Sequence, residues 1–171
     1  MTDPHYTIEI QIDEEYTSQV DAAALVATAE AGLTALTAPA ASLTIVVTDD
    51  DQVQALNRDY RGVDTPTDVL SFAAQDTQEA AVKLVIPAEL AATVAAYLGD
   101  IVIALPYAER QAARFGNSLA DELRLLTVHG VLHLMGYDHA TQAEEDAMWA
   151  IQEAVLNQFG IARLARRSYD E

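Results

Sequence analysis

The segment HGVLHLMGYDH occupies residues 129–139 and contains three of the four histidines of the chain. His129 and His133 are four residues apart, just over one helical turn, so a helix would project both imidazoles from one face. Gly136 stands where a helix can end in a left-handed conformation, which lets the chain double back. The segment therefore predicts a helix, a glycine turn and a third imidazole, from His139, that returns to the first two.

Three imidazoles in this arrangement suit a metal ion, above all zinc. Two histidines on one helix face can bind a zinc ion at about 2.0 to 2.1 Å, and a third ligand leaves one position open. An open position is typical of catalytic zinc. Two alternatives stay open: the histidines pack separately, or Asp138 closes a structural site as the fourth ligand. Asp138 fits better as a residue that orients one of the metal ligands from outside the coordination sphere.

Gly130 stands directly after the first histidine. Zinc peptidases of the H-E-x-x-H type carry a glutamate there as general base. A peptidase built on this segment would therefore lack its proton acceptor. Water bound to zinc can ionise near neutral pH without that carboxylate, so an anionic substrate such as a phosphodiester suits the site better than a peptide.

The rest of the chain predicts an α+β domain: a small mixed β-sheet packed with helices, with the metal site on a helix and the following turn. Apolar alternation and β-branched runs predict strands over 6–12, 42–48, 68–72 and 99–105. Helical spacing and capping residues predict helices over 18–36, 50–60, 87–97, 106–115, 118–136 and 141–159. With no repeat and no linker, residues 1–171 should form one domain, with a flexible tail from about residue 162.

Composition narrows the function classes. The chain has 171 residues and no cysteine, which excludes disulfides and thiolate metal sites and fits a reducing cytoplasm. Its net charge of −18 opposes non-specific binding to nucleic acid or anionic lipid, although a local site can differ. The uncharged stretch 31–48 is interrupted by Gly32, Pro39 and Ser42, so a helix end, a turn and a strand explain it better than a membrane span.

The segment 129–139 also resembles the H-G-x-L-H-L-x-G-Y-D-H signature of the YbeY family, bacterial endoribonucleases and ribosomal RNA maturation factors. LNRDYRGVDTPTDVLSF (56–72) and LGDIVIALPYAERQA (98–112) resemble two upstream segments of that family, in the same order. The resemblance covers roughly residues 40 to 155. Residues 73–97 are longer than the usual family connection, and the acidity is marked for a protein that cuts RNA.

The resemblance implies a zincin-like domain in which His129, His133 and His139 bind one zinc ion and Arg61 is the functional arginine near the metal. It implies a metal-dependent endoribonuclease that prefers single-stranded RNA. It also implies a role in 16S rRNA processing and ribosome quality control. The ribosome or ribosomal proteins are then expected partners, and the cytoplasm is the expected location.

Arg61 carries the proposed catalytic charge in this interpretation. A guanidinium can engage two phosphate oxygens and stabilise the charge that builds during cleavage, whether water or the internal 2′-hydroxyl of the RNA attacks. Arg58 lies one helical turn earlier and could bind a second phosphate, although a solvated surface residue is the simpler interpretation. A zinc peptidase, or a ribosome-assembly module with a purely structural zinc, are the remaining alternatives. The sequence leaves the oligomeric state open.

Overall fold

A four-stranded mixed sheet forms the centre of the molecule, which we describe from a computed structural model of residues 4–74 and 96–166. The strands are β1 (Tyr6–Ile12), β2 (Ala41–Thr48), β3 (Val69–Ala73) and β4 (Tyr97–Ala104). Their order across the sheet is β1-β2-β4-β3. The first three of these run parallel, and β3 pairs antiparallel with β4 at one edge. The expected mixed sheet is confirmed.

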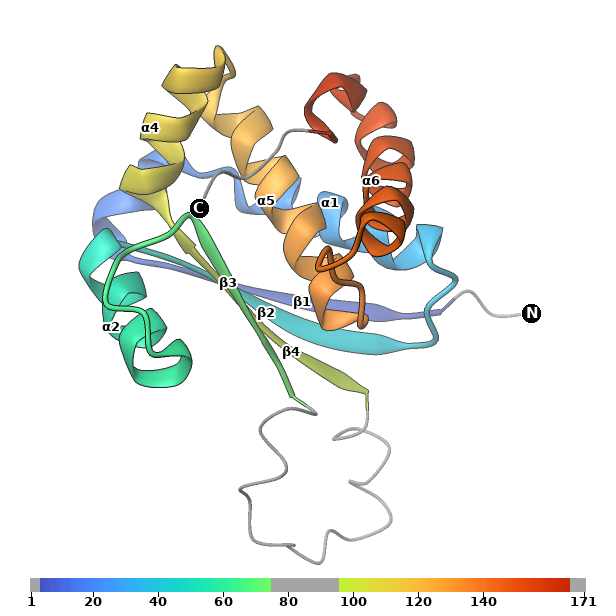
Figure 1. The fold of residues 1–171 in the computed structure, drawn as a ribbon, viewed down its shortest axis with the longest axis horizontal. Coiled ribbons are helices and arrows are strands. Elements are labelled where there is room, and N and C mark those ends of the chain that lie inside the picture. The colour runs from blue at the N-terminus through green and yellow to red at the C-terminus, as the bar shows by residue number, and fades with distance from the viewer. Residues whose placement is uncertain (1–3, 75–95, 167–171) are drawn as a thin grey trace, which may run out of the picture.

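Helices cover both faces of this sheet. They are η1 (Glu14–Gln19), α1 (Ala22–Ala35), α2 (Asp50–Arg61), α4 (Leu105–Phe115), α5 (Leu119–Leu134), α6 (Gln142–Asn157) and η3 (Ala162–Leu164). Figure 1 shows α1, α5 and α6 gathered on one side of the sheet and α2 on the other. The α+β class expected from the sequence is therefore confirmed.

Strand alternation divides the core between the two faces. Ile101 and Ile103 of β4 join the apolar cluster that includes α1 and α5, whereas Val102 and Ala104 join the cluster that includes α2. This is the two-residue period of a strand covered on both faces. Helix α5 also packs on α6 through a third cluster, so it is the middle layer of the molecule. Two of the three predicted metal ligands, His129 and His133, lie on this helix.

Three helix starts follow the capping signals of the sequence. The side chains of Asp49, Ser118 and Thr141 accept hydrogen bonds from backbone N–H groups three residues ahead, at 2.8, 3.1 and 3.1 Å. Such bonds satisfy donors that the first helical turn leaves unpaired. The helices α2, α5 and α6 therefore begin where local side-chain chemistry places them.

The structure corrects two expected elements. The helix expected from residue 18 begins only at Ala22, because Val20 is extended and the Asp21 side chain caps the helix by accepting from the Ala24 N–H. Tyr97, expected at the end of a helix over 87–97, instead opens β4. Ala96 lies in a turn, and residues 87–95 of that expected helix lie outside the described residues.

The C-terminal segment is more ordered than the sequence suggested. The expected flexible tail began at about residue 162, yet Ala162–Leu164 form η3 and the side chains of Leu164 and Ala165 are buried against α5 and α6. Apolar residues at the start of the tail find a surface that the sequence pattern did not reveal. Residues from 167 onward lie outside the described part, and the single domain over 1–171 stays a prediction. None of the helices within 4–74 and 96–166 is long and apolar enough to span a membrane.

Candidate metal centre

The end of α5 is built to return the chain toward its own last turn. Gly136 has φ 95°, a left-handed conformation that glycine adopts without strain. Its N–H donates to the His133 carbonyl, and the Tyr137 N–H donates to the Leu132 carbonyl, both at 3.0 Å. This pair of bonds is the Schellman motif. In the following turn, the Asp138 carboxylate accepts the His139 N–H at 2.8 Å.

This turn brings the three predicted ligands together. Nε2 of His129 lies 3.0 Å from Nε2 of His133. The ring centroid of His139 is 5.4 Å from that of His129 and 5.3 Å from that of His133. One ring nitrogen from each residue lies within 4.8 Å of the other two. Such a cluster of nitrogen donors could hold a metal ion.

The site has one buried and two half-buried candidate ligands. His129 is only 6% exposed, whereas His133 and His139 are intermediate. Trp149 of α6 packs beside the cluster, with its ring centroid 5.9 Å from that of His129 and 5.5 Å from that of His139. Met148 and Trp149 belong to the core, and Trp149 also forms an apolar wall of the site. An apolar wall keeps the ligand nitrogens from being fully hydrated.

His133 is poised to be neutral. Burial lowers its pKa below the ordinary value, and the charges of His139 and Arg61 lower it further. The Asp138 carboxylate and a hydrogen bond to the Tyr137 backbone act in the opposite direction but are outweighed. A neutral imidazole keeps the lone pair that a metal requires. Asp138 therefore affects His133 through its charge and holds the turn through its hydrogen bond with the His139 N–H.

Gln152 is a residue of the site that the sequence analysis missed. Its side chain is fully buried, and its Oε1 lies 2.9 Å from Nδ1 of His129. The available signal was a glutamine on the apolar face of α6, at helical spacing from Met148 and Leu156. A polar side chain at such a position needs a buried partner.

The structure explains the glycine after the first histidine. A Cβ at Gly130 would lie 2.8 Å from Cγ2 and 2.9 Å from Cδ1 of Ile101, closer than real Cβ atoms approach a neighbour. Ile101 is fully buried in β4 beneath α5. Gly130 therefore lets α5 lie close to the sheet, and there is no room for the glutamate of a zinc peptidase.

Arg61 ends α2 and reaches across to the edge strand β3. Its Nη2 donates to the Ser71 carbonyl at 2.6 Å, and its guanidinium carbon lies 5.6 Å from the centroid of the Phe72 ring. Ser71 is the partner of Ile101 in the β3–β4 register, and Ile101 is the residue against which Gly130 packs. Arg61 is thus anchored to the strand pair that supports the histidine-bearing helix.

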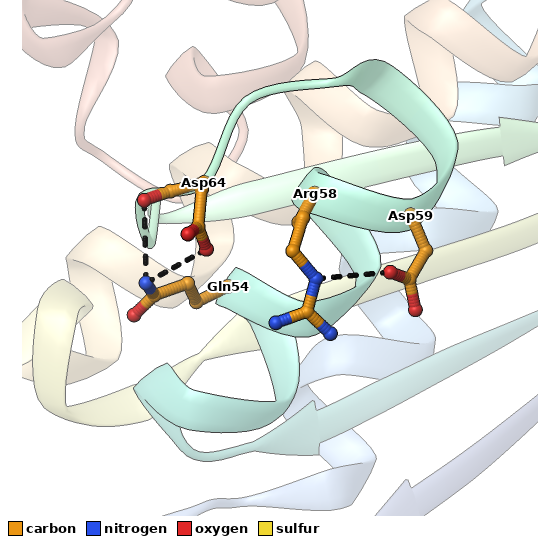
Figure 2. A network of polar contacts seen from close by, with 4 residues as sticks. All are labelled: Gln54, Arg58, Asp59 and Asp64. Atoms are coloured by element: carbon orange, nitrogen blue, oxygen red, sulfur yellow. Dashed lines mark hydrogen bonds and ion pairs between the residues drawn. The ribbon is translucent and has the colours of Figure 1, made fainter.

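Arg58 is held differently. Its Nε donates to the Asp59 carboxylate at 3.0 Å, and this contact raises the arginine pKa. Figure 2 shows this pair beside a second contact, in which Gln54 donates to the backbone and the carboxylate of Asp64. Arg58 is thus paired with an acidic neighbour on its own helix. A role for Arg58 in substrate binding stays a prediction.

Comparison with known proteins decides the family. The model of the family Endoribonuclease YbeY matches residues 5–160. The chain belongs to the YbeY family. The Endoribonuclease YbeY of Geobacillus kaustophilus is 48% identical over 123 residues, which are 72% of this chain and 76% of that protein. That of Chloroflexus aggregans is 44% identical over 160 residues, 92% of this chain and 99% of its relative.

The fold agrees with this assignment. The solution structure of TM1509 from Thermotoga maritima superposes with a TM-score of 0.54 at 23% identity, over 95% of this chain and 97% of that one. At this identity the likeness concerns the fold alone. The family and the relatives named above are endoribonucleases, so this chain belongs to a family of enzymes that hydrolyse RNA phosphodiester bonds. The family resemblance seen in the sequence is confirmed.

Proposed function

We propose that this chain is a zinc-dependent endoribonuclease that prefers single-stranded RNA. We further propose that it acts in 16S rRNA maturation and ribosome quality control in the cytoplasm, on or near the ribosome. The observation that carries the proposal is the convergence of three histidine nitrogens within 4.8 Å, in a chain of an endoribonuclease family. The absence of cysteine fits a reducing compartment.

Zinc is the metal that best fits this donor set. His129, His133 and His139 offer three imidazole nitrogens, and neither thiolate nor carboxylate supplements them within the cluster that the described residues form. Three histidines with an open position are a known arrangement for catalytic zinc. A zinc ion bound there would supply Lewis acidity and lower the pKa of water. The lowered pKa of His133 keeps that ligand ready to bind.

Arg61 is the group that we assign to phosphate. The guanidinium has five N–H donors, and the contact with the Ser71 carbonyl uses one nitrogen only. This contact and the Phe72 ring hold the planar group in one orientation, so little conformational freedom remains to be lost when it meets a phosphate. The Arg61 side chain is exposed, and its positive charge contributes to lowering the pKa of His133. Arg61 can therefore stabilise the negative charge that develops on a phosphodiester held at the histidines.

The attacking group is either water or the 2′-hydroxyl next to the scissile phosphate, and the products distinguish them. Attack by the 2′-hydroxyl leaves a 2′,3′-cyclic phosphate or a 3′-phosphate. Arg61 has the same role in both reactions. The peptidase alternative loses its support, because Ile101 occupies the space that a glutamate at position 130 would need.

The decisive experiment incubates zinc-loaded protein with one unstructured and one structured RNA of equal length, followed by end-group analysis. We expect internal cleavage of the unstructured RNA, and we expect His133→Ala and Arg61→Ala proteins to leave it intact. Cleavage that persists in His133→Ala protein at the wild-type rate would identify a contaminating nuclease and remove the proposal.

A second experiment separates an enzyme from an assembly module with a structural zinc. The protein is treated with a chelator, and cleavage and circular dichroism are followed together. An enzyme of the proposed kind loses cleavage and keeps its fold, because the apolar clusters that hold α5 in place consist of residues other than the three histidines. Unfolding on chelation would favour the structural role.

A further inference from the structure

Gln152 is a buried polar residue that the proposed reaction does not use. Its side chain is fully buried within the cluster between α5 and α6. Oε1 lies 2.9 Å from Nδ1 of His129, and Nε2 donates to the Ala165 carbonyl at 2.8 Å. One amide thus joins a candidate metal ligand to the C-terminal segment that follows η3.

The Ala165 contact fixes which way the amide faces. A backbone carbonyl only accepts hydrogen bonds, so the group of Gln152 that faces it must be the NH2. The other end of the amide, the carbonyl oxygen, is then the one that faces His129. This oxygen cannot donate. The hydrogen of the contact must therefore come from Nδ1 of the imidazole.

A hydrogen on Nδ1 determines the other ring nitrogen. In a neutral imidazole one nitrogen carries the hydrogen and the other carries the lone pair. Nε2 of His129 is thus the lone-pair nitrogen, and it is the atom that faces Nε2 of His133. The lone pair of the most buried ligand already points to the place where the three rings converge.

We propose that Gln152 is a positioning residue of the metal centre, which holds His129 in the tautomer and ring orientation that presents Nε2 to the metal. The Ala165 carbonyl in turn orients Gln152, so the C-terminal segment supports the site from a distance. The proposal rests on the proposed metal role of His129. Partners of this kind commonly act on ligating histidines, where they fix the tautomer and the ring orientation.

A purely structural role would make different demands on the side chain. If Gln152 served only to donate a hydrogen bond to the Ala165 carbonyl, its contact with the His129 imidazole would not matter for metal binding. Replacement of Gln152 would then lower the free energy of unfolding and leave metal affinity alone. The test therefore measures the tautomer and the metal affinity separately from stability.

The experiment compares wild-type protein with Gln152→Met and Gln152→Glu. The methionine variant has similar length but neither accepts strongly nor donates. A buried glutamic acid in its neutral form can do both, as the amide does. Nitrogen-15 NMR of the metal-free proteins reports which nitrogen of His129 carries hydrogen. Titration with zinc under competition from a chromophoric chelator gives the affinity.

In wild-type and Gln152→Glu protein we expect the ring hydrogen of neutral His129 on Nδ1. In Gln152→Met protein we expect a mixture of the two neutral tautomers, with the hydrogen on Nδ1 in one and on Nε2 in the other. Zinc affinity should fall by about 10- to 100-fold in Gln152→Met protein, the usual cost of losing such a partner. It should recover most of that loss in Gln152→Glu protein. A hydrogen on Nε2 in the metal-free wild type, or wild-type zinc affinity in Gln152→Met protein, would overturn the proposal.

Thr28→Val is the matched control. Thr28 is also fully buried, and its hydroxyl accepts from Arg124 at 2.7 Å and donates to the Ala24 carbonyl at 2.7 Å. Its replacement removes buried hydrogen bonds without touching the histidines, so stability should fall while zinc affinity stays unchanged. If Gln152→Met protein does not fold, the wild-type and Gln152→Glu spectra still decide the tautomer. Failure of the wild type to bind zinc would contradict the proposed function instead, because the tautomer is read without metal.

Discussion

Gly130 and Ile101 approach so closely that a single added methyl group would overlap: a Cβ on Gly130 would lie 2.8 Å from Cγ2 of Ile101. The contact joins the helix that carries two of the histidines to the strand that pairs with Ser71, the anchor of Arg61. The packing of α5 on the sheet therefore links the position of the candidate metal ligands to that of Arg61.

The first prediction concerns Gly130→Ala. In a helix interior alanine is favoured over glycine by about 1 kcal/mol, but overpacking a full core costs about 1 to 3 kcal/mol. We expect the variant to be destabilised in the wild-type background. In an Ile101→Ala background the space is free, and the same change should stabilise. Urea unfolding of the four proteins measures this reversal of sign, and equal effects in both backgrounds would contradict the packing explanation.

The second prediction concerns metal stoichiometry. We expect one zinc ion per chain, because the described residues contain one cluster of three histidines. His133→Ala should lower the zinc content sharply, since it removes one of three ligands. His5→Ala is the control, because His5 is exposed before β1 and lies outside the cluster. Elemental analysis after dialysis gives the ratio, and equal zinc in wild-type and His133→Ala protein would refute the ligand assignment.

The third prediction concerns Arg61→Ala, which should retain zinc and fold but lose cleavage by about 10²- to 10³-fold, as for other charge-stabilising donors. Arg61→Lys should restore little, because an ammonium lacks the planar fork that the Ser71 carbonyl and Phe72 orient. Arg58→Ala is the comparison, and its ion pair with Asp59 predicts a smaller effect. Single-turnover cleavage of a labelled RNA measures all three, and near-wild-type cleavage by Arg61→Ala would contradict the role.

The fourth prediction is a pH dependence of the metal-free protein. Burial lowers the pKa of folded His133 below 6.5, whereas the unfolded chain keeps the ordinary value. Between these two values the unfolded chain binds more protons, so the free energy of unfolding should fall as the pH falls from 6.5 to the folded pKa. Below both values this contribution becomes constant. Urea unfolding at a series of pH values should show the slope in wild type and a weaker one in His133→Ala protein; identical slopes would contradict the shift.

The fifth prediction concerns the salt dependence of RNA binding. The chain has nine lysines and arginines against 27 carboxylates, and Arg58 and Arg110 are paired with Asp59 and Asp50. Arg61 and at most one further cation should then neutralise phosphates. For single strands the slope of log affinity against log salt is about −0.7 per phosphate, hence about −0.7 to −1.4 here. A titration with a short labelled strand that gave a slope steeper than about −4 would reveal a basic surface elsewhere.

The features that could be predicted from the sequence are those set by interactions between residues close together in the chain. Three helices begin with a hydrogen bond between residues only three positions apart, at Asp49, Ser118 and Thr141. His129 and His133 share a helix face because they are about one helical turn apart. The glycine turn at Gly136 acts over the next few residues. Interactions of such short range depend little on the rest of the chain, so helix starts and the convergence of the histidines could be predicted.

Where local signals competed, the sequence misled. Residues 18–21 were expected to form the first turn of the alanine-rich helix α1, but the extended conformation of Val20 and the cap at Asp21 delay the start of the helix to Ala22. From the sequence we expected a flexible tail from about residue 162, yet Leu164 and Ala165 pack against apolar residues of α5 and α6. Whether such a segment packs depends on a surface that exists only once other elements have assembled.

By itself the sequence indicated the three candidate ligands, the turn that brings them together and the absence of a peptidase glutamate at position 130. Only the tertiary structure decided why a glycine stands there, and that Gln152 faces His129 across 23 positions of chain. The reason is physical. Helical spacing specifies which side chains share a face, but the neighbour that a buried face meets depends on how separate elements pack, and no local pattern encodes that contact.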